Sequence, residues 1–583
     1  MLKRISKLVF ILFAIPCSLI AQETISGIGG IVKGPNNEPL VGATITATYL
    51  PTGTVYRTIS RIQGVFNITN MEPGGPYTIV FSFVGFADER KEDIYLSLGV
   101  KSNFNIALSD KSGNLTEVIV TARRLGNNGK GGTETTLGRE RIAAMPTVNR
   151  SLNDFLRYTP QAKITTDGAG ISIAGQNNRY NAFYIDGAIN NDVFGLAASG
   201  TNGGQANINP ISIDAIDQFQ VVISPFDASI GGFTGGGVNA TTRSGTNTAS
   251  GSIWAYYRNQ DLAGKTPGNV SKSARVKLAT FKNQLYGFRY GDAIIKNKLF
   301  FFILGEVQRD IRPQPFNFAT YRGIGTLDSV NKLVSYLKSA YNYDPGTFLD
   351  NPEKVRANRI NAKIDWNISN RNKVSLSYRY NDGERFNTSA SNTTNVNFYN
   401  NGFIFPTTAH TATGEVRTAF KHNATNRFLL TYTHVLDDRN PIGTPFPRVT
   451  IADGSGNYVF GTENFSTANL LLQKNWTLYD AFKLNLGKNL LTIGTDNLYS
   501  DAKNVFIRDN FGTYNYGSLN AFITNQKPTR YQRTFSLLDN KNEKTTAAAA
   551  AFKYMNLAFF INDEIRATDR LSLNFGLRVD GTE

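Results

Sequence analysis

Apolar and polar residues alternate along several segments in the C-terminal part of the chain. Residues 360–368, 374–380 and 571–579 place an apolar side chain at every second position, with mostly polar residues between them. A period of two is typical of a β-strand that has one apolar and one polar face. These segments therefore predict antiparallel strands, and similar segments recur from residue 249 to residue 583.

The connections between these segments are of two alternating kinds. Short turns (295–298, 423–426 and 487–489) alternate with long polar stretches (312–355, 382–411 and 437–465). A soluble β-sandwich would also have apolar strand faces, because these faces pack against a second sheet. Short turns at one end and long loops at the other instead favour a transmembrane β-barrel. We count about eleven strands in residues 248–583 and interpret them as barrel wall.

The first 247 residues are predicted to hold two further domains. Residues 22–110 contain short β-prone runs separated by Gly, Pro and Asn clusters, which predicts a small β-sandwich. Residues 133–247 mix short helices with strands, and Ser151 and Asp154 form a capping-box pattern shortly before Pro160. The expected elements are 29–33, 44–49, 64–68 and 77–83 in the first domain, and 138–145, 151–158, 171–174, 183–185 and 219–223 in the second.

Residues 111–132 join these two domains and change character along their length. The segment 115–122 is short and rich in β-branched residues, whereas 123–132 is rich in Gly and Asn, as is typical of a flexible tether. A short strand on a tether can pair with the sheet edge of another protein. The same eight residues could equally form the last strand of the preceding sandwich, and their sequence does not decide between the two.

The start of the chain predicts where the protein is located, and the composition limits which metal sites and disulfides it can form. Lys3, Arg4 and Lys7 precede an apolar stretch at 8–15 that is too short to span a bilayer, so residues 1–21 are interpreted as a secretory signal peptide. The 583 residues include one Cys and three scattered His, which form neither a disulfide framework nor a zinc or iron cluster. No spacing typical of an enzyme, a cofactor site or a nucleic-acid-binding protein occurs.

The net charge of +16 belongs almost entirely to the predicted wall. Residues 246–583 carry 41 basic and 27 acidic side chains, a balance of +14. Such an excess could attract an anionic substrate or the phosphates of lipopolysaccharide. We favour the plainer explanation that balancing acidic residues belong to barrel sequence beyond these 583 residues.

Three groups of motifs resemble known families. The run GGIVKGPNNEPLVGATITA resembles the carboxypeptidase-regulatory-like module. The runs IAAMPTVNRSLNDFLRYTP, GISIAGQNNRYNAFYIDG and ISIDAIDQFQVVISPFDASIGGFTGGGVNATTRSG look like the plug domain of TonB-dependent outer-membrane receptors. Together they are similar to SusC-like and Oar-like receptors of the Bacteroidetes, and the resemblance covers about residues 24–583.

The resemblance implies an importer of a glycan or a peptide, powered by TonB and its inner-membrane partners. A surface lipoprotein of the SusD type, outer-membrane lipid and lipopolysaccharide are further partners of such a receptor. The TonB box, or a related segment, would be Leu115, Thr116, Glu117, Val118, Ile119, Val120, Thr121 and Ala122. The substrate-facing plug loop would hold Gln176, Asn177, Asn178 and Arg179, although these are equally well explained as polar turn residues that hold the loop.

One position departs from the family pattern. Ala174 stands where many relatives carry Arg in an Ile-x-Ile-Arg-Gly turn, so no role of that arginine carries over to this chain.

The predicted fold is mainly β, with an N-terminal β-sandwich, a mixed α/β plug domain and an incomplete antiparallel transmembrane β-barrel. A plug of over 100 residues needs a lumen on the scale of a barrel with about 22 strands. Eleven strands make about half of that barrel, so we expect an N-terminal portion of a longer receptor. The alternative function is a surface β-protein, used for adhesion or as a secretion scaffold, that transports nothing.

Overall fold

The computed structural model describes residues 24–111, 132–147, 150–165, 170–266, 271–420, 423–538, 546–568 and 571–583. The predicted signal peptide and the predicted TonB-box segment 115–122 lie outside these residues. Within them, no helix combines the length and the apolar character that crossing a bilayer requires.

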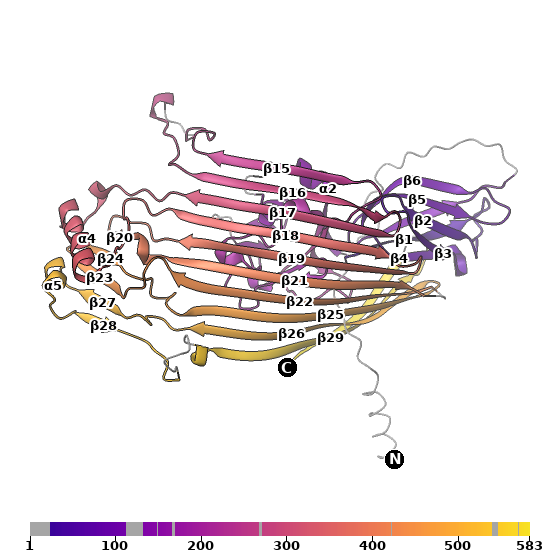
Figure 1. Cartoon of the computed structure of the whole chain (residues 1–583). Coiled ribbons are helices and arrows are strands. Elements are labelled where there is room, and N and C mark those ends of the chain that lie inside the picture. The colour runs from indigo at the N-terminus through magenta and orange to yellow at the C-terminus, as the bar shows by residue number, and fades with distance from the viewer. Residues whose placement is uncertain are drawn as a thin grey trace, which may run out of the picture.

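The N-terminal domain is a β-sandwich of two sheets, with the strand orders β4-β1-β7 and β3-β2-β5-β6 (Figure 1). Its buried hydrophobic cluster lies entirely between residues 28 and 108, so the domain has a core of its own. The strands are β1 Ser26–Lys33, β2 Thr44–Tyr49, β3 Thr54–Ile59, β4 Val65–Met71, β5 Gly74–Ser82, β6 Glu89–Leu96 and β7 Lys101–Ala107. The sequence predicted β1, β2, β4 and β5 but not the other three.

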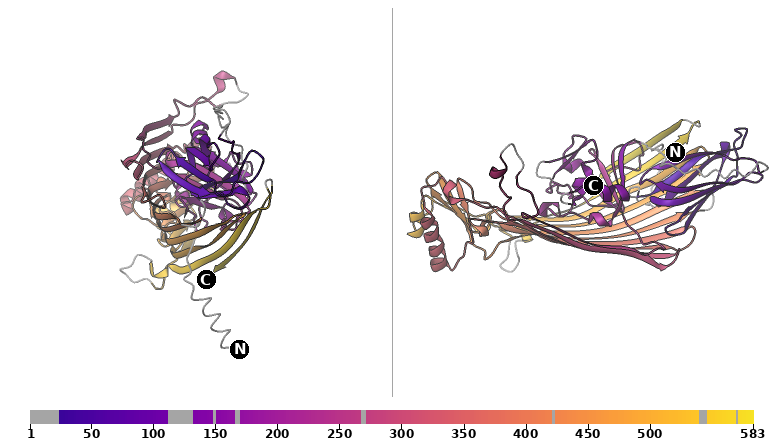
Figure 2. Two further views of the ribbon diagram at one scale, coloured as in Figure 1. Left: turned by 90° about the vertical axis from the view of Figure 1, so that its right-hand side faces the viewer. Right: turned by 90° about the horizontal axis from the view of Figure 1, so that it is seen from above.

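The second domain, residues 132–247, lies in the concavity of the large C-terminal sheet and is called the plug below (Figure 2). Its main sheet has the order β12-β11-β14-β13-β8, with β8 at one edge. Ser151 and Asp154 form the predicted capping box at the start of α3. The elements are β8 Gly132–Gly138, α2 Arg139–Ala144, α3 Leu152–Leu156, β9 Ala162–Ile164, β10 Ile171–Ile173, β11 Ala182–Ile185, β12 Ala188–Ile189, β13 Ile216–Pro225 and β14 Gly237–Thr242.

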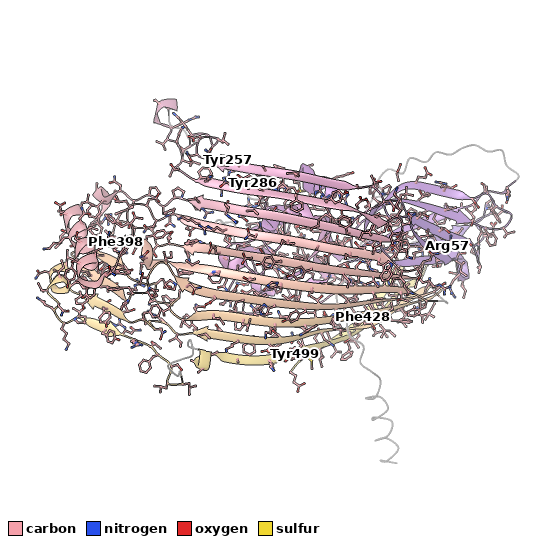
Figure 3. The ribbon with its side chains drawn as sticks, in the orientation of Figure 1. Arg57, Tyr257, Tyr286, Phe398, Phe428 and Tyr499 are labelled. Carbon is pink, nitrogen blue, oxygen red and sulfur yellow. The ribbon has the colours of Figure 1, made fainter. Side chains whose placement is uncertain are left out.

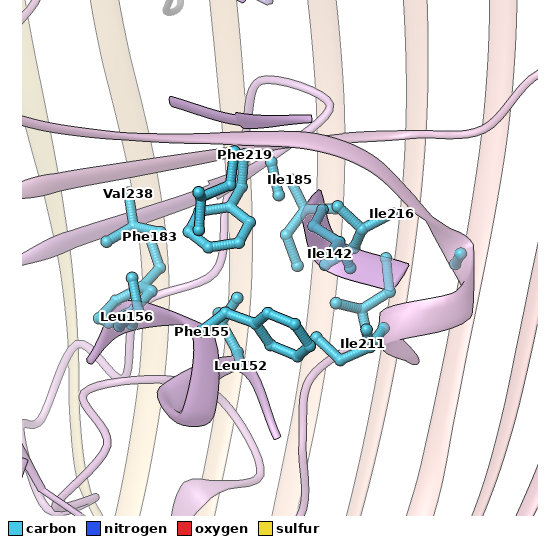
Figure 4. Packing of buried hydrophobic residues seen from close by; sticks show 14 of the residues in the cluster. Ile142, Leu152, Phe155, Leu156, Phe183, Ile185, Ile211, Ile216, Phe219 and Val238 are labelled. Carbon is cyan, nitrogen blue, oxygen red and sulfur yellow. The ribbon is translucent and has the colours of Figure 1, made fainter. Parts of the chain in front are cut away.

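The plug core packs the helices against the sheet (Figure 4). Phe155 of α3 meets Phe219 of β13 edge to face, with the ring centroids 6.2 Å apart. Two side chains of the large C-terminal sheet, Phe302 and Leu304, belong to the same buried cluster. The plug is therefore in apolar contact with β17 of that sheet, and further buried clusters join Ala206 and Ile208 of the plug to other wall strands.

The C-terminal sheet, called the wall below, contains eleven strands that pair antiparallel with their neighbours in one continuous order from β15 to β30. The strand number predicted from the sequence is thus confirmed. The sheet is curved but not closed, because the two edge strands β15 and β30 do not pair with each other. The strands are β15 Ser250–Asn259, β16 Lys282–Ile295, β17 Leu299–Arg312, β18 Glu353–Asn367, β19 Asn372–Asn387, β21 Phe403–Ala419, β22 Ala424–Pro441, β25 Asn469–Leu486, β26 Asn489–Phe506, β29 Ala550–Arg566 and β30 Ser572–Thr582.

The convex face of the wall is apolar. On β18, Ile360 and Ile364 are exposed on this face, while Asn361 between them is buried against the plug side. Figure 3 labels Phe428 and Tyr499, two more exposed apolar side chains of the wall. A band of exposed apolar side chains on the outside of a closed barrel faces lipid. The alternation predicted for residues 360–368 and 374–380 is confirmed.

Four long connections of the wall, those after β17, β19, β22 and β26, gather at one end into a small folded unit, called the cap below (Figure 1). Its sheet has the order β20-β24-β23-β27-β28, and its strands come from three different connections. The sequence did not predict this unit. Its elements are α4 Leu327–Tyr341, β20 Asn395–Asn397, β23 Arg448–Asp453, β24 Gly456–Phe460, β27 Thr513–Tyr516, α5 Leu519–Ile523 and β28 Arg530–Gln532.

The sandwich lies at the opposite end of the wall, where the short turns are (Figures 1 and 2). Three of the predicted connections were misplaced. The one expected at 437–465 lies slightly later in the chain, because β22 continues to Pro441 and β25 begins at Asn469. Residues 424–426 of the turn expected at 423–426 belong to β22 instead, because β22 begins directly after Asn423, which has a φ of 62°. The connection expected at 382–411 is shorter, since β19 continues to Asn387 and β21 begins at Phe403.

Candidate functional site

The predicted plug loop follows a tight turn at Ala174 and Gly175, which ends strand β10. Gln176, Asn177 and Arg179 are exposed and Asn178 is half-buried. The backbone N–H of Gln176 donates to the carbonyl of Ile173 at 3.0 Å, which closes the turn. The loop therefore presents polar side chains on the surface of the plug.

Three of these side chains also make bonds within the plug. Asn178 Nδ2 donates to the Ala197 carbonyl, and Arg179 Nε donates to the Gly195 carbonyl, both at 2.8 Å. Asn177 Oδ1 accepts from the backbone N–H of Arg179 at 3.1 Å. These bonds explain Asn177, Asn178 and Arg179 as residues that fix the loop, and a role in substrate binding remains a prediction.

The loop that receives these bonds, residues 190–208, was not singled out from the sequence. The Asp192 carboxylate accepts from the backbone N–H groups of Phe194 at 3.1 Å and Ala197 at 2.6 Å. Phe194 also packs against Phe552 of β29, near the end of the wall that carries the long connections. This loop therefore forms the plug surface that faces the cap end. Its Asn, Asp and Gly content marks turns, but only the tertiary contacts show that it meets residues 176–179.

A strained residue shapes this surface. Ala174 has a φ of 54°, in the left-handed region that costs a residue with a Cβ about 1–2 kcal/mol. Because a glycine loses about 0.5–1 kcal/mol through its freer unfolded chain, we expect Ala174→Gly to raise the free energy of unfolding of the plug by up to about 1 kcal/mol. Urea unfolding of the purified protein measures this change, and an exposed control such as Ala143→Gly in helix α2 should lower stability instead.

A cleft of about 400 Å³ opens between the plug and the wall beside this surface. Its plug side is formed by α3 and by residues near 199–210, and its wall side by strands β15 to β18. Tyr256 lies on the wall side, and the guanidinium of Arg150 stacks 4.5 Å from the centre of its ring. Other polar lining residues are Asn207, Asn209, Asn283, Gln284 and Gln308. Amide, aromatic and charged groups together suit a polar ligand with hydrogen-bonding groups.

A buried charge pair forms the floor of the cleft and joins the plug to the wall. Arg359 of β18 and Glu306 of β17 make an ion pair of 2.9 Å, and both side chains are 4% exposed. Glu306 also accepts from Ser212 Oγ of the plug at 2.7 Å, and Arg359 Nε donates to the plug carbonyl of Asn209 at 3.1 Å. The plug is thus held against this part of the wall by polar contacts.

Within the described ranges, no group of three or more His, Cys, Asp or Glu side chains is placed to hold a metal ion. The predicted TonB-box residues lie outside the described ranges, so the structure does not test them.

Comparison with known families identifies all three domains. Residues 27–109 match the carboxypeptidase regulatory-like domain, and residues 129–238 match the TonB-dependent receptor plug domain. Residues 241–322 and 326–582 match the outer membrane beta barrel domain, which covers more than half of the chain. The resemblance stated from the sequence motifs is therefore confirmed for each domain.

The chain is also similar to individual relatives and solved structures. The chain is 27% identical over 289 residues to the TonB-dependent transporter Oar of Myxococcus xanthus, which covers 47% of this chain and 26% of Oar. Its fold is similar to that of the outer membrane transporter YddB from Escherichia coli, with a TM-score of 0.54, 16% identity, and coverage of 77% of this chain and 56% of YddB. The ferric enterobactin receptor of Pseudomonas aeruginosa gives a TM-score of 0.49 at 15% identity, covering 77% of this chain and 57% of the receptor. The chain therefore spans about a quarter of the curated relative and about half of these solved structures.

Proposed function

We propose, since the chain belongs to the outer membrane beta barrel family and carries a plug domain, that it acts in a TonB-dependent receptor that imports a substrate across the outer membrane of a Gram-negative bacterium. The substrate binds from outside, at the cleft and at the plug surface beside it. An energised periplasmic partner then displaces part of the plug. The work must arrive mechanically, because the outer membrane has neither ATP nor a substantial ion gradient of its own.

The observation that carries this proposal is the polar part of the contact between plug and wall, which lies beside apolar contacts. Ser212 and Asn209 of the plug bond to the Glu306–Arg359 pair of the wall. When such groups separate, water can replace each lost hydrogen bond. Separating a wholly apolar contact would instead cost about 25 cal/mol for each Å² of newly exposed surface. This polar part of the contact therefore suits a plug that has to move.

The pull is proposed to act through residues 115–122. These residues precede Gly132, at which β8 begins, and β8 is the edge strand of the plug sheet and pairs there with β13. Tension on this segment thus reaches the plug sheet at its edge. Removing β8 breaks one ladder of hydrogen bonds and leaves the pairing of β11 with β14 in the centre of the sheet intact.

Deleting residues 115–122 tests whether TonB binds this segment. We expect this deletion to abolish binding of the purified receptor to the periplasmic C-terminal domain of TonB, because β-augmentation draws its affinity from main-chain bonds along this segment. A matched deletion of residues 123–130 shortens the tether equally but keeps the segment, and it should bind normally. Calorimetric titration measures both. Equal binding by both variants would contradict the assignment of the segment.

The substrate class is proposed to be a glycan or a peptide. Gln176, Asn177, Asn178 and Arg179 lie on the exposed plug surface, and a SusD-type lipoprotein would close the cap end. Fluorescein-labelled oligosaccharides and fluorescein-labelled casein peptides serve as probes of energy-dependent uptake into cells. Uptake of one probe class that disappears with residues 115–122 supports import. Uptake of neither class, together with intact surface exposure, favours the scaffold function.

A further inference from the structure

The sandwich is docked across the short-turn end of the wall. Thr69 Oγ1 lies 2.8 Å from Thr425 Oγ1 of β22, and Asn70 Nδ2 donates to the Asn426 carbonyl at 3.2 Å. The Thr54 hydroxyl accepts from Asn367 Nδ2 of β18, the fourth strand of the sheet, at 3.1 Å. At the far side of the arc, Lys101 pairs with Glu564 of β29. One small domain thus reaches wall strands from β18 to β29.

The same domain also contacts the plug. The Gln218 side chain of β13 accepts from the backbone N–H of Leu98 at 3.0 Å and donates to the carbonyl of Leu96 at 3.4 Å. Seen from the short-turn end, the sandwich lies in front of the plug (Figure 2). It therefore stands between the plug and the side of the membrane toward which a pulled plug would leave.

The contact surface is charged, although the core of the sandwich is apolar. Glu72 of the sandwich accepts from Arg417 of β21 at 2.6 Å, and Lys373 of β19 lies against the ring of Tyr56, with Nζ 4.3 Å from its centre. Burial alone would raise the pKa of Glu72, but Arg417 and Lys373 outweigh it and lower that pKa. A cavity of about 80 Å³, lined by Thr and charged side chains, lies where sandwich, plug and wall meet.

We propose that the N-terminal sandwich is a releasable lid on the periplasmic end of the receptor, and that it must leave the wall before the plug can move. The inference rests on the proposed import function. Two observations support the proposal. The sandwich contacts both the wall and the plug at that end. It also has its own hydrophobic core, so it can detach from the wall without unfolding.

Because the contact between sandwich and wall is polar, the sandwich can separate from the wall at a low cost in free energy. Burying two opposite charges costs desolvation free energy, and their attraction offsets only part of it. When such a pair separates into water, both charges are hydrated again, so the separation costs less than breaking an apolar core. The tether 112–131 connects the sandwich to β8 of the plug. A pull on the tether therefore loads the lid and the edge of the plug together.

A disulfide between sandwich and wall tests the lid. Thr69→Cys with Thr425→Cys places two thiols where hydroxyls are now 2.8 Å apart, and sulfur atoms in a disulfide are about 2 Å apart. The variants also carry Cys17→Ser, because Cys17, in the predicted signal peptide, is the one Cys of these 583 residues. Ala206→Cys adds a reporter thiol on the plug, at a site that is 0% exposed and packs against wall residues such as Ala357.

Labelling of the reporter by a membrane-impermeant maleimide is measured in cells with and without TonB, by mass spectrometry of the peptide that contains position 206. We expect TonB-dependent labelling in the reduced protein, and a drop to the TonB-free level once the disulfide has formed. Two controls are included. Dithiothreitol should restore TonB-dependent labelling of position 206, and variants with the reporter and only one of Thr69→Cys and Thr425→Cys should be labelled normally.

Two results overturn the proposal in distinguishable ways. If the disulfide forms and labelling stays TonB-dependent, the plug moves with the sandwich in place, so the lid is wrong while the import function stands. If labelling is independent of TonB even in the reduced protein, the plug is not driven by TonB, and the proposed function fails together with the lid.

Discussion

Replacing Phe460 by Ala should unravel the cap as one unit while leaving the wall and the plug folded. Phe460 of β24 is 0% exposed, and its ring lies 5.6 Å from Phe522 and 6.3 Å from Phe398. These two partners come from two other connections of the wall, and α4 of a fourth connection packs on the same cluster through Leu337. Removing a buried Phe side chain costs about 3–5 kcal/mol. This loss is a large part of the free energy that so small a hydrophobic core contributes to folding of the cap.

Proteinase K treatment of intact cells measures the effect. We expect new cleavage sites in all four connections that build the cap, at protease concentrations that leave the parent protein uncut. Phe535→Ala is the matched control, because Phe535 lies on the cap side but is 60% exposed. Cleavage confined to the connection that contains β24 would show that the loops are independent, contrary to the shared core.

The cap also shows what the sequence could not provide. Thr326 and Ser329 form a capping box at the start of α4, and this helix has one apolar face, so its local signals were present. The short strands of the cap carry no such signal. Strand β20 has three residues and pairs with β24, some 60 positions away. Its existence depends on connections that meet only after the wall has formed.

The strands of the wall could be predicted from the sequence where one face is exposed on the outside and the other is buried against the plug. On β18, Ile364 faces outward and Asn361 faces the plug, so the alternation appears in the sequence. Strand β17 breaks the pattern. Its inward residues Phe300, Phe302 and Leu304 are apolar and buried as well, and Phe302 and Leu304 belong to the hydrophobic cluster of the plug. A strand with two apolar faces loses the period of two, although the strand itself was counted.

The sandwich and the site follow the same logic. Strand β6 was missed because its first five residues, Glu89 to Asp93, are all charged, as suits an edge strand that must not pair with other chains. For the plug loop, the motif pointed to Gln176–Arg179 as an exposed polar loop. Its bonds to Gly195 and Ala197 join segments about 16 to 19 residues apart and carry no motif of their own.

Breaking the buried pair between Arg359 and Glu306 should loosen the plug more than any other single polar change. The variant Arg359→Met keeps most of the side-chain volume but leaves the carboxylate of Glu306 buried without its cation. Removing one partner of a buried pair costs about 3–5 kcal/mol. The variant also removes the bond to the Asn209 carbonyl, so the cost falls on the contact between plug and wall.

Hydrogen exchange of the purified protein, read by mass spectrometry on peptides from β13 and β14, measures this loosening. We expect these amides to exchange at least about a hundred-fold faster, since a loss of about 3–5 kcal/mol is more than two factors of ten at about 1.4 kcal/mol each. Arg356→Met on the same strand is the control. Its partner is Glu384, and the two side chains are 52% and 31% exposed, so the loss should be at most about 1 kcal/mol.

The double variant Arg359→Met with Glu306→Leu separates two causes of the effect. If the stranded charge dominates, removing both charges should recover most of the protection, because apolar replacements of a buried pair are often neutral. If the double variant exchanges as fast as the single one, the loss comes from the bonds to Ser212 and Asn209 instead. In that case the plug is held by hydrogen bonds that water can replace one at a time, and a steady pull would release it gradually rather than in one step.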